Sequence, residues 1–204
     1  MSKKNITLTV LAIILFSVLA IAIKADYLAG FESWVYNESV EHMSEPLTDV
    51  LKIITNIGGP IGILVICSAI LLIPKLRNKV GIPVSLAVVS SFTLNFVLKL
   101  CFERERPNIL RLVSESSYSF PSGHAMVNMA LYTILIIYTF KFMDKKKFKI
   151  PLITFMTLLI VAIGFTRVYL GVHYAGDILG GWLLGFAVSM VIYMIMKHTT
   201  INDD

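Results

Sequence analysis

Six apolar runs, each long enough or nearly long enough to cross a lipid bilayer, limit what this chain can fold into. They cover residues 6–23, 61–73, 82–102, 122–140, 150–169 and 177–196. Hydrophobic residues make up 56% of the 204 residues and charged residues 15%, which is more apolar surface than a soluble domain of this length can bury. We therefore predict an all-α integral membrane protein with six transmembrane helices, in which residues 1–204 form a single domain.

The segments before and after the first apolar run need separate interpretation. The run follows Lys3 and Lys4, as in a secretory signal peptide, and Ala-Ile-Ala at 20–22 is similar to a cleavage site. The run is longer than a usual signal core, which favours a retained helix. The polar stretch 24–56 predicts two short interfacial helices, the second beginning at Ser44 as its N-cap. We expect both to cover the membrane surface; the alternative is that they admit substrate.

The basic residues predict how the helices are oriented. Eleven of the 18 lysines and arginines fall on one side of the predicted membrane, at positions 3, 4, 75, 77, 79, 141, 145, 146, 147, 149 and 197. The other seven, at positions 24, 52, 99, 104, 106, 111 and 167, fall on the side that also carries three polar motifs. Because cytoplasmic loops carry the excess of Lys and Arg, we expect both termini in the cytoplasm and the three motifs at the outer face.

The first polar motif is a pair of cations at the end of the run 82–102. Lys99 and Arg106 are seven residues apart, about two helical turns, so they can share one face. Arg offers a planar fork and Lys a point charge, a combination that suits a phosphate. The alternative is that the two side chains reach lipid headgroups. We expect Arg104 and Arg111, flanked by acidic residues that include Glu115, to face solvent or headgroups.

The second motif, Phe120-Pro121-Ser122-Gly123-His124, opens an apolar run. Unpaired backbone N–H groups at a helix start favour an anion. Ser122 can cap the helix or donate its hydroxyl, Gly123 allows a ligand to approach the backbone, and His124 can exchange a proton near neutral pH. The motif alone is equally consistent with an ordinary serine cap beside an interfacial histidine.

The third motif contains Thr166, Arg167, His173 and Asp177. His173 and Asp177 are four residues apart, so they can meet on one helical turn. A carboxylate on one ring nitrogen fixes the tautomer and leaves the other nitrogen as a nucleophile. Because a charge such as Asp177 is costly inside an apolar run, it indicates a functional role.

The three motifs in this order resemble the signature of the type 2 phosphatidic acid phosphatase family. The matching pattern is Lys99-x6-Arg106-Pro107, Pro121-Ser122-Gly123-His124 and Arg167-x5-His173-x3-Asp177. The resemblance covers residues 99–177, and the plan of six spans extends it over the chain. The family usually has serine before the third-motif arginine, where this chain has Thr166.

The resemblance implies a mechanism and a role for each residue. Lys99, Arg106, Ser122, Gly123 and Arg167 are expected to bind the phosphate. His173 is expected to attack phosphorus and form a phosphohistidine, with Asp177 orienting it and His124 protonating the leaving oxygen. The cations replace a metal, so we expect no metal or other cofactor.

A site at the outer membrane–water interface favours a lipid phosphate over a soluble ester. Phosphatidylglycerophosphate and undecaprenyl pyrophosphate rank equally as substrates, and phosphatidic acid is a further candidate. The expected location is a bacterial plasma membrane. The expected partners are the lipid substrate and the bilayer; the lysines cluster in short loops, which argues against nucleic acid, and no obligate protein partner is indicated.

Three alternatives follow from the same residues. A phosphotransferase would pass the phosphate to a lipid or sugar acceptor instead of water. An anion channel would spread its charges along a path, whereas this chain has them at one end. A serine hydrolase using Ser122 would need a Gly-x-Ser-x-Gly elbow, which the sequence lacks.

Overall fold

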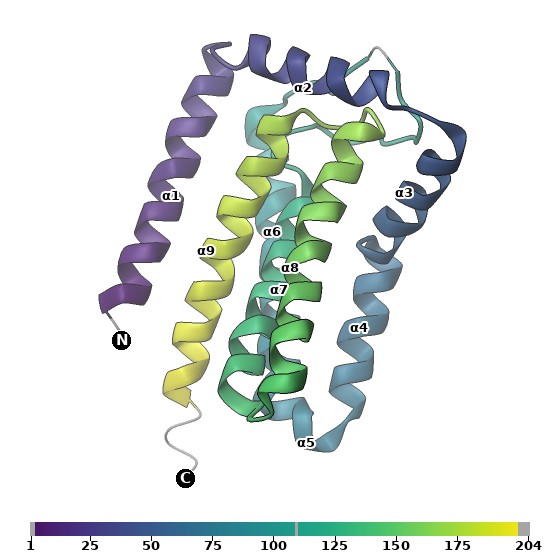
Figure 1. Cartoon of the computed structure of the whole chain (residues 1–204). Coiled ribbons are helices and arrows are strands. Elements are labelled where there is room, and N and C mark those ends of the chain that lie inside the picture. Colours follow the sequence, from purple (N-terminus) through teal and green to yellow (C-terminus); the bar gives the residue numbers. More distant parts are fainter. Residues whose placement is uncertain (1–2, 109, 200–204) are drawn as a thin grey trace.

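The computed structural model describes residues 3–108 and 110–199, and every regular element in these ranges is a helix (Figure 1). The elements are α1 (Lys3–Lys24), α2 (Ala29–Glu41), α3 (Glu45–Ile57), α4 (Pro60–Leu72), α5 (Pro74–Leu76), η1 (Arg77–Gly81), α6 (Ile82–Phe102), α7 (Gly123–Phe142), α8 (Lys146–Tyr169) and α9 (Ala175–Thr199). Five helices are long and apolar enough to cross a membrane, and the number is six if the bent pair α3 and α4 is counted as one span. The predicted all-α membrane fold is therefore confirmed.

Helix α1 packs along α9 as a member of the bundle. Its buried residues, Thr9, Ala12, Phe16 and Ala20, recur at helical spacing and form one face. The ring of Phe16 stacks on the ring of Phe120, with centroids 5.5 Å apart, directly before the second polar motif. The first apolar run thus packs as a helix of the bundle, as the interpretation of a retained helix requires.

The two helices expected on the membrane surface differ from one another. Helix α2 lies across one end of the bundle, as predicted (Figure 1). Helix α3 instead continues into α4 with a bend of 44° at Gly58-Gly59-Pro60. It packs against α8, where Leu51 joins a buried cluster with Tyr169. An apolar helix face can pack against a protein neighbour as well as against a membrane surface. The spacing of apolar residues in α3 therefore could not distinguish a helix on the membrane surface from one packed against α8.

Ser44 stands at the start of α3 but its side chain makes no cap hydrogen bond. Its backbone N–H instead donates to the hydroxyl of Tyr169 at 3.1 Å. The predicted position of the cap is correct, whereas the predicted side-chain contact is wrong, because an aromatic hydroxyl from α8 occupies the start of the helix.

Helix α7 lies at the centre of the bundle and packs against α6, α8 and α9. The close approach of α9 to α7 depends on Gly181 and Gly185, because a Cβ atom on either residue would collide with backbone atoms at the start of α7. A Cβ atom on Gly181 would lie 2.7 Å from the carbonyl oxygen of Ser122. Small residues at an interface let two membrane helices pack closely. This packing fixes the position at which α7 begins.

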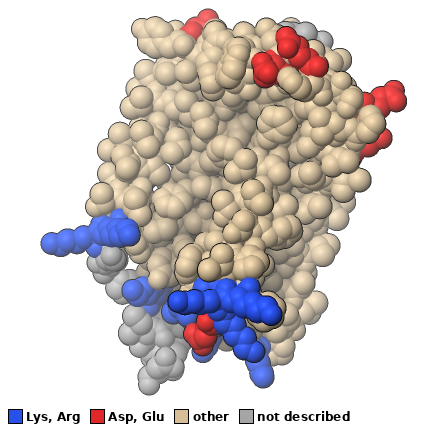
Figure 2. Space-filling model, in the orientation of Figure 1, with Lys and Arg blue, Asp and Glu red and all other residues tan. Residues whose placement is uncertain are grey.

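Charged residues lie at the two ends of the molecule and leave an apolar waist. Figure 2 shows Lys and Arg gathered at the end where α1 starts and α9 ends, and most of the visible Asp and Glu at the opposite end. Large apolar side chains are exposed along the helices between these ends, among them Ile14, Leu64, Phe92 and Leu158. A waist of this kind is suited to lipid rather than water.

Candidate active site

The residues predicted from the three motifs meet at the end of the bundle that α2 covers, called the site end below. They are Lys99, Arg106, Ser122, Gly123, His124, Arg167, His173 and Asp177. Lys99 and Arg167 stand in the last turns of α6 and α8. Ser122 precedes α7, and Asp177 stands in the first turn of α9. Separate helix ends thus bring all eight residues to one region.

His173 and Asp177 form the pair that their spacing predicts. Nδ1 of His173 lies 3.3 Å from Oδ2 of Asp177, and the two residues are 2% and 0% exposed. The same oxygen accepts hydrogen bonds from the Ser119 hydroxyl at 2.5 Å and from the backbone N–H of Tyr174 at 2.9 Å. Ser119 was missed in the sequence, since it stands in a polar connection with other serines and no pattern marks it.

The environment of His173 keeps its imidazole neutral near pH 7. Burial lowers the pKa of His173 to about 4, helped by the positive charges of Arg106 and Lys99 and opposed by Asp177. A neutral imidazole has a free lone pair on one nitrogen. His173 is therefore in the protonation state that a nucleophile requires.

Arg106 and Lys99 are buried beside His173, at 7% and 8% exposure. Arg106 is held by backbone carbonyls: Nε donates to Ser117 at 2.6 Å and NH1 donates to Val172 at 2.8 Å. The ammonium of Lys99 donates to the carbonyl of Tyr118. Both cations line the cavity described below, so they retain access to an incoming anion.

Arg167 reaches the same region from α8 and pairs with Glu115. Its NH1 donates to the Thr55 hydroxyl at 2.9 Å, and its NH2 donates to the Glu115 carboxylate. The other carboxylate oxygen of Glu115 lies 3.8 Å from NH2 of Arg106. Glu115, for which the sequence predicted no role, therefore lies between two of the predicted phosphate ligands, where its charge balances theirs.

Arg104 was predicted to face solvent or headgroups, and this is wrong. Its guanidinium donates to Asp177 and to Glu32 of α2, each at 2.6 Å, and its side chain is 19% exposed. The chain turns at Glu103, whose φ of 46° lies in the left-handed region. This turn directs Arg104 toward α2. Arg111 is exposed, as expected.

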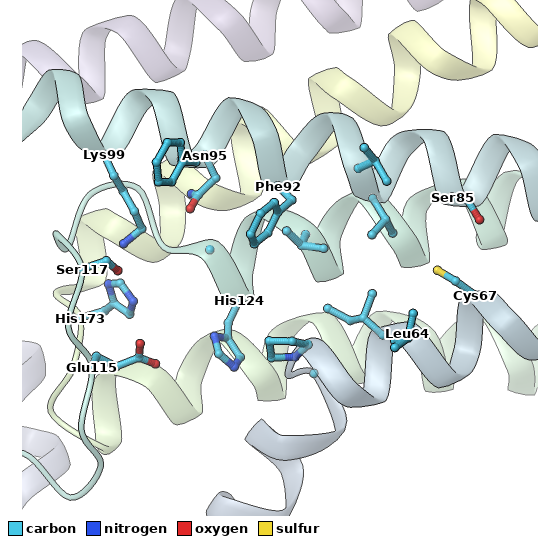
Figure 3. Close-up of a pocket in the computed structure, with 18 of the residues that line it drawn as sticks. Leu64, Cys67, Ser85, Phe92, Asn95, Lys99, Glu115, Ser117, His124 and His173 are labelled. Carbon is cyan, nitrogen blue, oxygen red and sulfur yellow. The ribbon is translucent and has the colours of Figure 1, made fainter.

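The start of α7 presents the second motif to the cavity. The Ser122 hydroxyl accepts a hydrogen bond from the backbone N–H of Ala125 at 3.5 Å, so it acts as a cap. Gly123 lies close to Asn95, because a Cβ atom there would be 3.1 Å from the Asn95 amide oxygen. Figure 3 shows the His124 ring in the cavity together with that of His173. The two histidines predicted to act on one phosphate therefore share one space.

Thr166 does not contact the cavity through its hydroxyl. The side chain is fully buried, and Oγ1 donates to the carbonyl of Ile163 at 2.7 Å, within α8. Threonine thus satisfies its hydroxyl on the helix backbone, as it commonly does in helices.

A cavity of about 610 Å³ extends from these residues along apolar side chains of α4, α6 and α7. At the site end it is lined by His124, His173, Lys99 and Arg106, and farther along by Leu64, Cys67, Val88, Phe92 and Val127 of α4, α6 and α7 (Figure 3). A polar head with an apolar extension matches the two parts of a lipid phosphate. Within the described parts of the chain, no group of three or more His, Cys, Asp or Glu side chains is placed to hold a metal.

Comparison with known proteins identifies the family and the fold. Residues 80–201 match the model of the PAP2 superfamily. The chain is 32% identical to phosphatidylglycerophosphatase B of Bacillus subtilis, over 87% of this chain and 89% of that one. It is 31% identical to an undecaprenyl-diphosphatase of Sulfolobus acidocaldarius, over 63% and 61%. The solved transmembrane PAP2 type phosphatidylglycerolphosphate phosphatase of Bacillus subtilis superposes with a TM-score of 0.83 at 29% identity, covering 93% of this chain and 96% of that one.

Proposed function

Because the chain belongs to the PAP2 superfamily and is a membrane lipid phosphatase, we propose that it removes the terminal phosphate of phosphatidylglycerophosphate, undecaprenyl pyrophosphate or both. The observation that carries the proposal is the buried His173 beside the buried cations Arg106 and Lys99, at the head of an apolar cavity. The names of the two relatives supply the substrates, and the higher identity and coverage favour phosphatidylglycerophosphate as the first to test.

The proposed reaction has two steps. Nε2 of His173 attacks phosphorus, the P–O bond to the lipid breaks, and His124 donates a proton to the leaving oxygen. Water then attacks the phosphohistidine, with His124 accepting its proton, which releases inorganic phosphate and restores His173. Lys99, Arg106 and Arg167 hold the phosphoryl oxygens in both steps and stabilise their charge, with Ser122 and the Gly123 N–H at the start of α7.

The proposed orientation has both termini in the cytoplasm of a bacterial cell and the site at the outer face of its plasma membrane. Four of the seven cations at the site end are buried or half-buried in the site, namely Lys99, Arg104, Arg106 and Arg167. Few are left on that surface, whereas the opposite end is densely basic (Figure 2). The surface asymmetry therefore supports this orientation more strongly than the sequence count did. A fluorescent protein fused to the C-terminus should fluoresce if that end is cytoplasmic.

A substrate panel tests the proposed function. Purified protein and His173→Ala are offered phosphatidylglycerophosphate, undecaprenyl pyrophosphate, phosphatidic acid and a soluble phosphate ester. We expect phosphate release from at least one lipid by the native protein and none by the variant. Release by neither protein, or equally by both, would contradict the proposal.

Two additions to the panel test the remaining expectations. Labelled water should place its oxygen in the released phosphate, whereas transfer to a lipid or sugar acceptor would identify a phosphotransferase. Activity should persist after exhaustive chelation, because cations of the protein occupy the role of a metal. Activity that disappears and returns with magnesium would overturn that expectation.

A further inference from the structure

Arg104 binds two buried carboxylates at once. NH1 donates to Oδ1 of Asp177 and NH2 donates to Oε2 of Glu32, both at 2.6 Å. The two acidic side chains are 0% and 5% exposed. The guanidinium also lies over the Tyr174 ring, 4.3 Å from its centroid. Carboxylates and an aromatic face thus hold Arg104 in one position, which is the geometry in which arginine differs most from lysine.

The two oxygens of Asp177 have different partners. Oδ1 accepts from Arg104, whereas Oδ2 accepts from His173, Ser119 and the backbone of Tyr174. Fixing Oδ1 fixes the plane of the carboxylate and so the direction of Oδ2 toward the imidazole. Without Arg104, a fully buried carboxylate would lose its cation and one oxygen would lose the partner that it has in this structure, which is costly in a buried site.

Glu32 holds the guanidinium from the opposite side. Its Oε2 accepts from Arg104, and its Oε1 lies 3.3 Å from the backbone nitrogen of Gly176, which donates to it. Gly176 immediately precedes Asp177 at the start of α9. Helix α2 is therefore connected to the candidate catalytic aspartate by two routes, through Arg104 and through the α9 backbone.

We propose that Arg104 is a positioning residue that keeps the Asp177 carboxylate directed at His173, and that Glu32 of α2 fixes Arg104 for this task. Helix α2 is then a working part of the active site rather than only a cover on the membrane. The inference rests on the proposed roles of His173 and Asp177.

Arg104 is separate from the residues that bind phosphate. Both of its terminal nitrogens are engaged by carboxylates, and it is not among the described residues that line the cavity. Lys99 and Arg106 do line it. Loss of Arg104 should therefore slow turnover and leave the affinity for phosphate largely unchanged, in contrast to loss of Arg106.

The pH profile distinguishes this role from a general structural one. The charged and titratable groups around His173 are Asp177 of α9, Lys99 of α6, His124 of α7, Arg167 of α8, and Arg106 and Glu115 of the connection between α6 and α7. Removing the Arg104 charge favours a proton on His173 as the partner of Asp177. The acid limb of the profile of kcat/KM against pH, where activity is lost as His173 is protonated, should therefore move to higher pH. Removing the Glu32 charge leaves more net positive charge, so the acid limb should move to lower pH.

The test compares Arg104→Gln, Arg104→Lys and Glu32→Gln in the full chain, with Arg111→Gln as an exposed arginine from the same connection. For Arg104→Gln we expect kcat to fall about 100-fold and the acid limb to rise by about one pH unit, because an orienting partner and a charge are both lost. KM and inhibition by inorganic phosphate should stay within about threefold of native, because a positioning contact acts on turnover rather than on binding. Arg104→Lys should recover part of kcat, Glu32→Gln should lower the acid limb, and Arg111→Gln should match the native protein.

Each outcome bears on the inference. Native-like kcat in Arg104→Gln, or a loss that appears mainly as weaker phosphate inhibition, would overturn it. If Arg104→Gln fails to fold, Arg104→Lys and Glu32→Gln decide: a native kcat in Arg104→Lys, which keeps the charge but loses the planar fork, or an acid limb in Glu32→Gln that does not move to lower pH, contradicts the proposal. An inactive His173→Ala with a fully active Arg104→Gln sinks this inference alone, whereas an active His173→Ala sinks the proposed function.

Discussion

Nε2 of His173 lies 3.2 Å from NH1 of Arg106, on the other side of the ring from Asp177. A guanidinium only donates hydrogen bonds, so Nε2 is the accepting nitrogen and Nδ1 carries the proton that faces Asp177. This is the tautomer that nucleophilic attack through Nε2 needs. Since Arg106 is also held by the carbonyls of Ser117 and Val172, a phosphate bound to it would lie beside the nitrogen that we propose attacks phosphorus.

The pH dependence of kcat/KM should show an acid limb near pH 4. Burial and the charges of Arg106 and Lys99 lower the pKa of His173 from 6.5 to about 4, and only the neutral imidazole can attack. The measurement uses a soluble phosphate ester, with aliquots returned to pH 7 to confirm that the protein survived each pH. An acid limb near 6.5 would contradict the assignment.

The same shift has a consequence for stability. Between pH 6.5 and about 4 the unfolded chain binds a proton at His173 that the folded protein does not bind. Stability from this residue is therefore lost as the pH falls through that window. Thermal melting in detergent should show a smaller acid-induced loss of Tm for His173→Gln than for the native protein.

Glu115→Gln should strengthen inhibition by inorganic phosphate. The Glu115 carboxylate pairs with Arg167 and lies 3.8 Å from Arg106, so a bound phosphate competes with it for both cations. Loss of that competing charge should lower the inhibition constant about tenfold, or about 1.4 kcal/mol. Glu105→Gln, an exposed acid of the same connection, should leave inhibition unchanged. Equal or weaker inhibition in Glu115→Gln would show that Glu115 does not compete with phosphate.

The sequence predicted the site residues that stand out against an apolar background. Lys99, Arg167 and Asp177 each break or end a hydrophobic run, and a charge in that position has few explanations. Ser119 and Glu32 stand in polar stretches, where serine and glutamate are ordinary. Their importance comes from tertiary contacts, such as the pairing of Glu32 with a residue 72 positions away, and no local pattern encodes such a contact.

Backbone conformation explains why the position of Arg104 was predicted wrongly. Arg104 and Arg106 are two residues apart and of one chemical type, yet one binds carboxylates under α2 and the other faces the cavity. The left-handed turn at Glu103 ends α6 directly before these two residues, and glutamate is not a residue that usually marks such a turn. The five long apolar helices were predictable because bilayer thickness sets their length, whereas the path of a connection depends on contacts made after folding.

Val88→Trp should impair lipid substrates more than a soluble ester. Val88 lines the apolar extension of the cavity on α6, so an indole there fills space that the hydrocarbon of a lipid would occupy. We expect KM for the lipid to rise about tenfold or more and kcat/KM for the ester to stay within about twofold, since only the lipid uses the apolar extension. Leu86→Trp places the same ring on the exposed face of α6 and should change neither. Equal losses for lipid and ester would indicate damage to the site instead of a blocked cavity.

Gly181→Ala should reduce both stability and turnover. Its new methyl group would meet the Ser122 carbonyl oxygen at 2.7 Å and the Ala125 Cβ atom at 2.9 Å. These atoms belong to the first turn of α7, so relief of the contact requires α9 or the start of α7 to move. Overpacking of this kind costs about 1–3 kcal/mol, which exceeds or equals the gain of about 1 kcal/mol from replacing a helical glycine by alanine. Thermal melting in detergent and kcat for a soluble ester give the two readouts.

Gly30→Ala is the matched control for that experiment. Gly30 lies in α2 with open space where its Cβ atom would stand, so alanine there should keep or raise Tm and leave kcat unchanged. The comparison separates the effect of close packing from that of helix propensity, because both changes replace a helical glycine by alanine. Since Ser122 and His124 depend on where α7 begins, a lower Tm in Gly181→Ala should be accompanied by a lower kcat. A Gly181→Ala protein that melts at the native temperature and turns over at the native rate would show that the position of α7 does not depend on this contact with α9.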